Sequence, residues 1–376
     1  MTTSTVPANV DDPVNARILT VSEDRVQGFH RDPLGYIAEQ SGVDLDTVVA
    51  RVRAMLEAGT IRRVRQTLLS TSLAPGALVA WQMPNDRLDE AFDFMFGEDP
   101  FSGHVVIRTT DRDTRGSDYR LWTTLKVPRP YDMTAHCRYL ASETGATAFR
   151  LLPARKLFAL GVGHVRRRDV EPGAKTDEPG RALDTEVVDL TDREWRVLTA
   201  LKREFAPDEL GPDLWAPRAE EAGETLEDFY AVVTDLARRD IVGRFSTFLE
   251  HAKRHADGTR VTKYNALFHW RVPEGEELRA GREVGRFHCM THAYWREGEA
   301  EFANVNIMGV SHGTDKDRVL AHKAAIDEHL EAVGIPVSYT NVFWGGRSEI
   351  KPSEVSPYAY RDWAHSRGLD PDTMRG

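Results

Sequence analysis

Apolar residues recur at helical spacing in two separate stretches of the chain. In each stretch they return every three or four positions, which predicts amphipathic helices. Thr191 and Glu194 have the spacing of a capping box, and Gly59 is typical of a helix end. The predicted helices cover residues 14–27, 32–41 and 44–59 in the first stretch and 191–205, 214–222 and 225–240 in the second. Three short helices followed by a strand indicate a winged helix-turn-helix unit in each half.

A mixed pattern of strands and helices follows each helical stretch. The first half predicts strands at 77–83, 104–109, 119–127 and 147–152, with helices at 86–96 and 131–144. The second half predicts strands at 265–272, 285–295, 302–310 and 337–343, with helices near 276 and at 316–333. Two βαβ units in succession indicate a ferredoxin-like α+β sandwich, in which helices cover one face of an antiparallel sheet.

One strand is written twice. The segment ALVAWQMP at 77–84 returns as ALFHWRVP at 266–273, which indicates a tandem duplication with the twin domains packed together as a pseudo-dimer within one chain. A homodimer of the fused chain is a further possibility. The predicted domains are two winged helix-turn-helix units at 14–65 and 189–245, two ferredoxin-like domains at 66–168 and 246–345, a linker at 169–188 and a C-terminal extension at 346–376. Three rings in the extension, Tyr358, Tyr360 and Trp363, predict that it packs against the protein.

Composition and charge narrow the class of partner. With 376 residues, 41% of them hydrophobic, the chain is expected to fold into globular domains, and no apolar run is long enough to predict a membrane partner. It contains 2 cysteines and no evident secretory leader, so we expect a cytoplasmic location. A net charge of -10 argues against nucleic acid as a partner, unless the basic residues gather on one face. The basic runs at 62–65 and 166–168 suit a polyanionic small molecule equally well.

The order of short motifs resembles a known family. A winged helix followed by a ferredoxin-like domain is the plan of the Lrp/AsnC transcription regulators. The more specific motifs resemble the siroheme decarboxylases, with the pattern of one subunit in the first half and that of the other subunit in the second. They are IRRV at 61–64, ALVAWQMP at 77–84, YRLWTTL at 119–125, LPARKLFALGV at 152–162, GRFSTFLEH at 243–251, NALFHWRVP at 265–273, THAYWR at 291–296 and NIMGVSHG at 306–313.

The resemblance implies an enzyme of the lyase class that acts in heme biosynthesis. Members of the family remove the carboxyl groups of the two acetate side chains of siroheme, and they bind the tetrapyrrole between paired sheets. The expected ligand is therefore an iron tetrapyrrole, heme or siroheme, as cofactor or as substrate. Two features depart from the family: an acidic segment at 297–301 replaces an aromatic, proline-containing stretch, and the extension at 346–376 is additional.

Histidines of the second half are the candidates for chemistry. His288 and His292 lie four apart on a predicted strand, so both should face one side of the sheet, and His269 lies on the repeated strand. His312 ends a neighbouring predicted strand, so it could share a cavity with His292. We predict catalytic roles for His292 and His312, with His292 as the iron ligand and an imidazole donating a proton to the carbanion that carbon dioxide leaves behind. The alternative is that each is an ordinary partly buried or surface histidine.

Arginines and tryptophans complete the predicted site. Guanidinium groups bind carboxylates in a bidentate manner, so Arg62, Arg63 and Arg65, together with Arg244 in the second half, are predicted to bind the ligand. The alternative is a basic wing inherited from DNA binding. The predicted set also includes His269 and His288, with Trp81 and Trp270 as flat walls for a macrocycle, although aromatic residues in such strands are usually core.

Two other functions remain open at the level of the sequence. A heme-dependent enzyme acting on another small substrate fits the altered acidic segment and the added extension. A DNA-binding regulator of the Lrp/AsnC kind fits the helical units, but the third predicted helix of each unit begins with acidic residues, which a major-groove helix would not favour.

Overall fold

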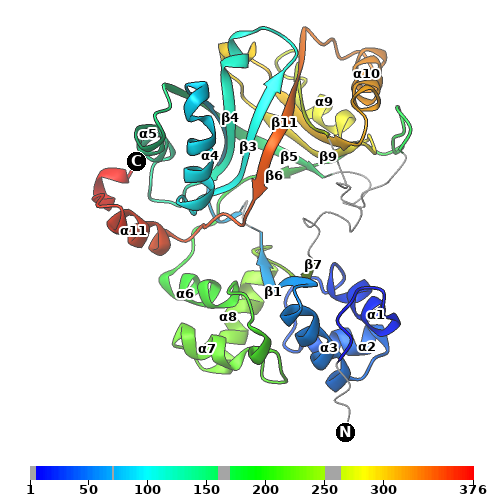
Figure 1. The fold of residues 1–376 in the computed structure, drawn as a ribbon, viewed down its shortest axis with the longest axis vertical. Helices are drawn as coiled ribbons and strands as arrows, with labels where there is room; N and C mark the ends of the chain where they lie inside the picture. Colours follow the sequence, from blue (N-terminus) through cyan, green and yellow to red (C-terminus); the bar gives the residue numbers. More distant parts are fainter. Residues whose placement is uncertain (1–5, 70–71, 160–169, 250–263) are drawn as a thin grey trace. The chain divides into compact units, whose positions relative to one another are not determined.

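The chain forms two compact units. The computed structural model describes residues 6–69, 72–159, 170–249 and 264–376 (Figure 1). A helical unit takes the described residues of Met1–Leu73 and Val188–Thr259, and a sheet unit takes those of Ala74–Val187 and Arg260–Gly376. Each unit therefore combines equivalent parts of the two sequence halves. The predicted basic run at 166–168 lies outside the described residues.

The helical unit contains two sets of three α-helices, each set followed by a strand. Side chains cap the helices as the sequence indicates: Asp44 accepts from the Thr47 N–H at 2.9 Å, and Thr191 and Glu194 form the capping box. The first set is α1 (Pro13–Ser22), α2 (Pro33–Ser41) and α3 (Leu45–Glu57), followed by β1 (Ile61–Leu68). The second is α6 (Asp192–Leu201), the short helix η4 (Pro207–Glu209), α7 (Ala216–Ala222) and α8 (Leu226–Arg238), followed by β7 (Val242–Leu249).

The strand after each helical set pairs with the strand of the other set. β1 and β7 run antiparallel, with Val64 opposite Thr247. The Gln66 side chain donates to the Gly243 carbonyl at 2.8 Å and so fixes the register further. A winged helix-turn-helix unit would pair this strand within its own set. In this protein the two sets share one two-stranded sheet, so they form a single body.

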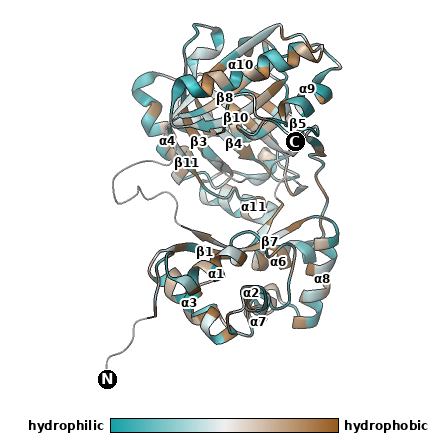
Figure 2. Cartoon of the chain, turned by 90° about the vertical axis from the view of Figure 1, so that its right-hand side faces the viewer, coloured by the Kyte–Doolittle hydropathy of each residue, from teal (hydrophilic) through white to brown (hydrophobic). Residues whose placement is uncertain are grey.

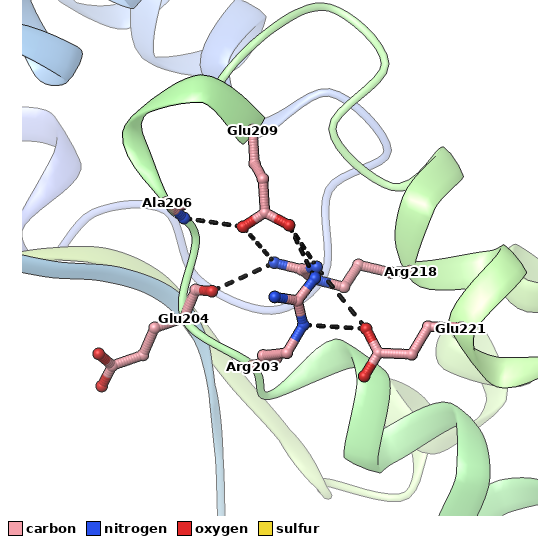
Figure 3. Close-up of polar contacts among 6 residues, drawn as sticks. All are labelled: Arg203, Glu204, Ala206, Glu209, Arg218 and Glu221. Atoms are coloured by element: carbon pink, nitrogen blue, oxygen red, sulfur yellow. Dashed lines mark hydrogen bonds and ion pairs between the residues drawn. The ribbon is translucent and has the colours of Figure 1, made fainter.

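A buried guanidinium organises the second helical set (Figure 3). Arg218 on α7 is fully buried and donates to both oxygens of Glu209, at 2.8 and 3.1 Å, and to the Glu204 carbonyl at 3.2 Å. Its guanidinium lies over the ring of Phe205, 4.5 Å from the centroid. Arg203 joins the same carboxylate from α6's C-terminal side at 2.7 Å. These contacts hold η4 between α6 and α7. Removing Glu209 would leave the buried charge of Arg218 without its main partner, which is costly.

The sheet unit contains a sheet that closes on itself. Its nine strands follow the order β2-β4-β3-β11-β8-β10-β9-β5-β6, and β2 also pairs with β5, so eight of them form a ring. All the pairings are antiparallel. The first half supplies β2 (Gly76–Gln82), β3 (Ser102–Thr110), β4 (Tyr119–Lys126), β5 (Ala148–Ala159) and β6 (Arg181–Asp184). The second supplies β8 (Tyr264–Arg271), β9 (Met290–Arg296), β10 (Ile307–Gly313) and β11 (Tyr339–Ile350).

The α+β class is confirmed, but the arrangement of two separate sandwiches is not. Each half contributes four strands to the ring, and the halves join where β3 pairs with β11 and β5 pairs with β9. Pairing at the edges satisfies backbone groups that two separate sheets would leave open. The predicted linker at 169–188 also belongs in part to the sheet, since β6 pairs with β5.

Helices cover the outside of the ring. These are α4 (Leu88–Gly97), preceded by η2 (Asn85–Arg87), α5 (Met133–Thr144), α9 (Glu277–Val284) and α10 (Lys316–Ala332). Two outer cores form beneath them, one around Trp81 and Phe92 and one around Trp270 and Ile326. A third, inner core contains Leu78, Ala80, Val106, Trp122, Leu267, Phe302, Met308 and Phe343. In Figure 2 hydrophobic colour marks many positions on these strands, and α10 carries both hydrophobic and hydrophilic positions.

The C-terminal extension packs on the first outer core, as predicted. Figure 1 shows α11 (Pro357–Ser366), in red, beside α4 and α5. Tyr360 is fully buried there, and its hydroxyl lies 2.9 Å from His136 Nδ1. His136 Nε2 lies 3.4 Å from the buried carboxylate of Asp99. A short helix η6 (Pro371–Met374) ends the chain, with Met374 in the same core.

Candidate functional site

Strand alternation places basic side chains on the inner face of the ring. On β3, Val106 belongs to the inner core, so His104 and Arg108, two residues away on either side, point the same way. On β10, Met308 and Val310 belong to that core, and His312 follows at the same period. Residues that pair across neighbouring strands point to the same face of the sheet. His292 on β9 pairs with Val310, so it points to the inner face. Thr124 on β4 pairs with His104, so Lys126, two residues further along β4, also points to the inner face.

Electrostatic effects connect these groups in two sets, one of His104 with Arg108, His292 and His312 and one of Lys126 with Arg296. Burial and the nearby charges of Arg108, His292 and His312 lower the pKa of His104 to about 3. Burial and the charge of Arg296 lower the pKa of Lys126 to about 8. We call the set His104, Arg108, Lys126, His292, Arg296 and His312 the inner-face cluster. No carboxylate of the described residues is among the groups that shift the pKa of His104, Arg108 or Lys126.

Arg108 is the most deeply buried cation of the cluster. Its side chain is 4% exposed, and burial alone lowers its pKa to about 9. One hydrogen bond, to the Phe343 carbonyl at 3.2 Å, holds the guanidinium, while its Nε has no partner among the described residues. A buried charge without a counterion is costly, so this position calls for an anion.

A second guanidinium lies on β9. Arg296 donates to the Leu152 carbonyl at 2.7 Å and lies over the ring of Tyr294, 4.5 Å from the centroid. Burial lowers the pKa of Arg296 and raises that of Tyr294. The ring of Tyr294 in turn stacks on His292 at 6.0 Å with an interplanar angle of 4°. The strand therefore presents an imidazole, a phenol and a guanidinium in sequence along one face.

The structure brings His292 and His312 together, and it separates His288 from them. His292 and His312 lie on adjacent strands and are both exposed. The charges of both contribute to the lowered pKa of His104. His288 was predicted on the same strand face as His292. It lies instead in the turn after α9, because β9 begins only at Met290. Residues 285–289, which the sequence pattern assigned to the strand, form turns after α9 instead.

His269 occupies the inner core. It is fully buried among the rings of Trp122, Phe302 and Phe343, at centroid distances of 6.0, 6.1 and 4.8 Å. Neither ring nitrogen has a hydrogen-bond partner in the described part of the chain. Burial, with smaller effects of Arg108 and Lys323, lowers its pKa to about 3. The imidazole is therefore neutral at physiological pH.

A His269→Phe variant is expected to resist acid better than the parent chain. Because the folded-state pKa is about 3 and the ordinary value is 6.5, only the unfolded state takes up the proton between these values, so stability falls as pH drops through this window. Phenylalanine should remove about 3 kcal/mol of the stability lost between pH 7 and pH 4. Chemical denaturation at both pH values measures this change. The exposed His365→Gln controls for loss of a histidine, and an unchanged pH slope in His269→Phe would contradict the expectation.

The predicted arginines lie in the helical unit. Arg62 is exposed on β1, Arg63 pairs with Glu204 at 3.1 Å, and burial lowers the pKa of Arg65. Arg244 on β7 donates to the Glu23 carbonyl at 3.1 Å and pairs with Asp24. These four groups lie together on the two-stranded sheet, and the histidines lie in the other unit. Their role in ligand binding remains a prediction.

Trp81 and Trp270 are core residues of the outer face. Both are fully buried; Trp81 donates to Thr123 at 3.0 Å, and Trp270 donates to Asp327 at 2.5 Å. Each ring packs under helices, on the face opposite to the inner core. The structure therefore corrects their predicted role as pocket walls, because the alternation of the repeated strand turns them away from the inner-face cluster.

Cavities and metal ligands do not suggest a different site. A cavity of about 820 Å³ is lined by Arg271 as well as by Glu274, Glu277 and Glu297, and one of about 310 Å³ lies beside Lys323 and Asp327. The inner-face cluster lines neither of these two cavities. The residues that the structure describes contain no group of three or more histidine, cysteine, aspartate or glutamate side chains that could hold a metal ion. His292 as an iron ligand remains a prediction. Across the same residues, no helix has the length and apolar character to span a bilayer.

Sequence reasoning missed His104, Arg108 and Lys126. A signal existed, because HVVIR at 104–108 places two basic residues on one side of an otherwise apolar strand. The apolar residues between them made the segment look like an ordinary core strand. Lys126 is the last residue of β4 and points to the same face as His104 and Arg108. Only the observed pairing of β3 with β4 shows that it lies near His104.

Comparison with known proteins finds similarity over most of the chain. Residues 74–159 match the family described as AsnC-like ligand binding domain. The chain is 23% identical over 283 residues to the siroheme decarboxylase NirDL subunit of Paracoccus pantotrophus, which covers 72% of this chain and 78% of that protein. It is also 23% identical over 281 residues to the protein of the same name from Paracoccus denitrificans, with the same coverage.

Solved structures show the same fold. The crystal structure of the siroheme decarboxylase NirDL superposes with a TM-score of 0.67 at 18% identity, covering 94% of this chain and 98% of the other. The structure of NirDL in complex with an iron-uroporphyrin III analogue gives a TM-score of 0.66, with coverage of 94% and 99%. The chain therefore has the fold of NirDL along almost its whole length.

Proposed function

We propose that this chain is a siroheme decarboxylase, a lyase that removes carboxyl groups from the acetate side chains of siroheme. The inner-face cluster is the observation that carries the proposal. It places buried cations on apolar strands, and no carboxylate of the described residues is among the groups that shift the pKa of Arg108 or Lys126. Such a cluster suits a ligand that brings its own carboxylates.

The chemistry of the surroundings supports a tetrapyrrole rather than a small anion. Arg108 and Arg296 offer forked donors that match the geometry of carboxylates, while Lys126 offers a point charge. The inner core, with the rings of Trp122 and Phe343, lies on the same face of the ring of strands as these cations. A flat, apolar macrocycle with charged substituents at its rim needs both kinds of surface.

In the proposed reaction, burial removes water from the carboxylate of one acetate side chain. The cations of the cluster bind the other carboxylates and orient the macrocycle. The bond between the methylene carbon and the carboxyl carbon breaks, carbon dioxide leaves, and the electron pair remains on the methylene carbon. The imidazolium of His312 then transfers a proton to that carbon, which becomes a methyl group. Loss of a desolvated carboxylate as neutral carbon dioxide supplies a source of rate.

The related proteins support the same assignment. The Paracoccus proteins are called siroheme decarboxylase NirDL subunits, and a protein of this fold binds an iron-uroporphyrin III analogue. We therefore propose siroheme as substrate and His292 as the residue that binds its iron. A neutral imidazole is a common ligand of tetrapyrrole iron.

Anaerobic incubation of the purified chain with siroheme tests the proposal. The expected result is conversion of siroheme to didecarboxysiroheme, which mass spectrometry of the extracted tetrapyrrole measures. Heme supplied in place of siroheme serves as the comparison. A stable Soret band with heme, together with siroheme that is neither bound nor converted, would instead favour a heme-dependent enzyme with another substrate.

A further inference from the structure

An acidic segment connects β9 to β10 at one end of the inner face. We call residues 297–304 the acidic strap. It contains Glu297, Glu299 and Glu301, and it includes the short helix η5 (Ala300–Phe302). Its backbone folds back on itself, with the Gly298 N–H donating to the Val305 carbonyl at 2.8 Å and the Asn304 N–H donating to the Glu299 carbonyl at 3.0 Å.

The strap neutralises an arginine that belongs to the inner face. Arg150 on β5 pairs with Ala80, a residue of the inner core, so its side chain starts from that face. Its guanidinium lies 2.5 Å from Glu301 through Nη2 and 3.1 Å from Glu299 through Nε. Arg108 has no such carboxylate partner among the described residues, although it lies on the same face. Arg150 therefore differs from Arg108 in that carboxylates of the protein itself already pair with its guanidinium.

The ion pairs between the strap and Arg150 are open to competition from water and from other anions. The side chains of Glu299 and Glu301 are 52% and 22% exposed, and ion pairs that reach solvent contribute little stability. The Arg150 Nε contact with Glu299 lacks hydrogen-bond geometry. Ala303 has a φ value of 55°, a left-handed conformation that costs alanine free energy, whereas Asn304, with a φ of 51°, is a residue type that adopts it more readily.

The strap also covers the inner core. Phe302 is 1% exposed and lies 5.3 Å from the ring centroids of both Tyr119 and Trp122. Arg150 lies over the same Tyr119 ring, 5.7 Å from its centroid. One segment therefore masks an aromatic wall and an inner-face guanidinium at the same time. A carboxylate-bearing macrocycle would use these two groups together.

We propose that Arg150 is a further substrate-binding residue. In the free protein Glu299 and Glu301 of the acidic strap block its guanidinium, and a carboxylate of the tetrapyrrole replaces them when the ligand binds. The inference rests on the proposed function for the identity of the ligand. The glutamates act as internal stand-ins for substrate carboxylates. Displacing them frees Arg150 to bind the ligand and withdraws Phe302 from Tyr119 and Trp122. The strap thereby selects ligands that carry enough negative charge to compete with it.

Equilibrium titration with iron uroporphyrin III tests the proposal by absorption. The double variant Glu299→Gln/Glu301→Gln should bind about threefold to tenfold more tightly than the parent, because the competing ion pairs are gone. Glu297→Gln is the matched control, since Glu297 pairs with the exposed Arg155 at 2.9 Å and leaves Arg150 untouched. It should bind like the parent. Adding Arg150→Gln to the double variant should abolish the gain.

Equal or weaker binding by a folded double variant would overturn the proposal, as would a gain that survives Arg150→Gln. Hydrogen exchange on the unaltered chain provides a measurement that does not depend on a variant. Amides of residues 298–305 should exchange faster when the tetrapyrrole is bound, and slower exchange would contradict strap release. The titration needs no turnover. Tighter binding without decarboxylation would therefore refute the proposed function alone, and decarboxylation without the gain would refute the strap alone.

Discussion

Replacing Arg108 with methionine is expected to weaken binding of iron uroporphyrin III by about a hundredfold, and at the same time to stabilise the ligand-free protein. The two effects have one cause. Arg108 is 4% exposed, and burial lowers its pKa to about 9, so the free protein bears the cost of a buried cation. Methionine fills similar space without charge. With ligand bound, the variant loses a charged contact of a kind that commonly costs about 2 to 5 kcal/mol.

Absorption titration measures the affinity, and thermal unfolding without ligand measures the stability. Arg112→Met is the matched control, because Arg112 follows the same strand but is exposed, and among the described contacts its side chain donates a hydrogen bond to the Thr340 carbonyl alone. It should change neither quantity much. Unchanged affinity in a folded Arg108→Met variant would remove the central support for the inner face as the binding site.

Replacing His312 with alanine is expected to slow decarboxylation by about a hundredfold to ten-thousandfold, the range typical of losing a general acid. Because the proposed role is proton transfer to the methylene carbon, the affinity for iron uroporphyrin III should change little. His292→Ala should instead alter the absorption spectrum of the bound tetrapyrrole, because the proposed iron ligand is lost. The measurements are single-turnover rates with siroheme and spectra of the bound complex.

His288→Ala is the control for both histidine variants. His288 lies in the turn before β9, so its removal should leave the rate and the spectrum unchanged. A His312→Ala variant with the turnover of the parent would exclude this residue as the proton donor. A His292→Ala variant with an unchanged spectrum would exclude iron ligation by His292.

Local patterns in the sequence predicted most of the elements and the proximity of two candidate histidines. His292 and His312 could be placed together because strand alternation and strand adjacency are both local properties, and β9 and β10 are neighbours in the chain as well as in the sheet. The Thr191 capping box was readable for the same reason. Packing of Tyr360 and Trp363 followed from their size, since large rings are seldom left in water.

Long-range pairing hid the rest. Trp81 and Trp270 lie on strands that are buried on both faces, so alternation could not reveal which face meets the inner core. Arg108 reaches its surroundings only because β3 joins β11, a strand from the opposite end of the chain. The strand of each helical set likewise pairs with its counterpart, which no spacing within either set indicates.

The joined edges of the ring bear on how the chain is made. As synthesis proceeds, β3 and β5 of the first half emerge long before β11 and β9, the strands that complete them. The nascent chain must hold an unfinished sheet, with two open edges and an apolar interior, until nearly all of it has left the ribosome. Such edges invite pairing with other chains, and contacts distant in sequence form slowly. We expect the first half made alone to associate with itself or aggregate. In the fused chain the second half is covalently attached, so the strands that complete the sheet are present at high local concentration.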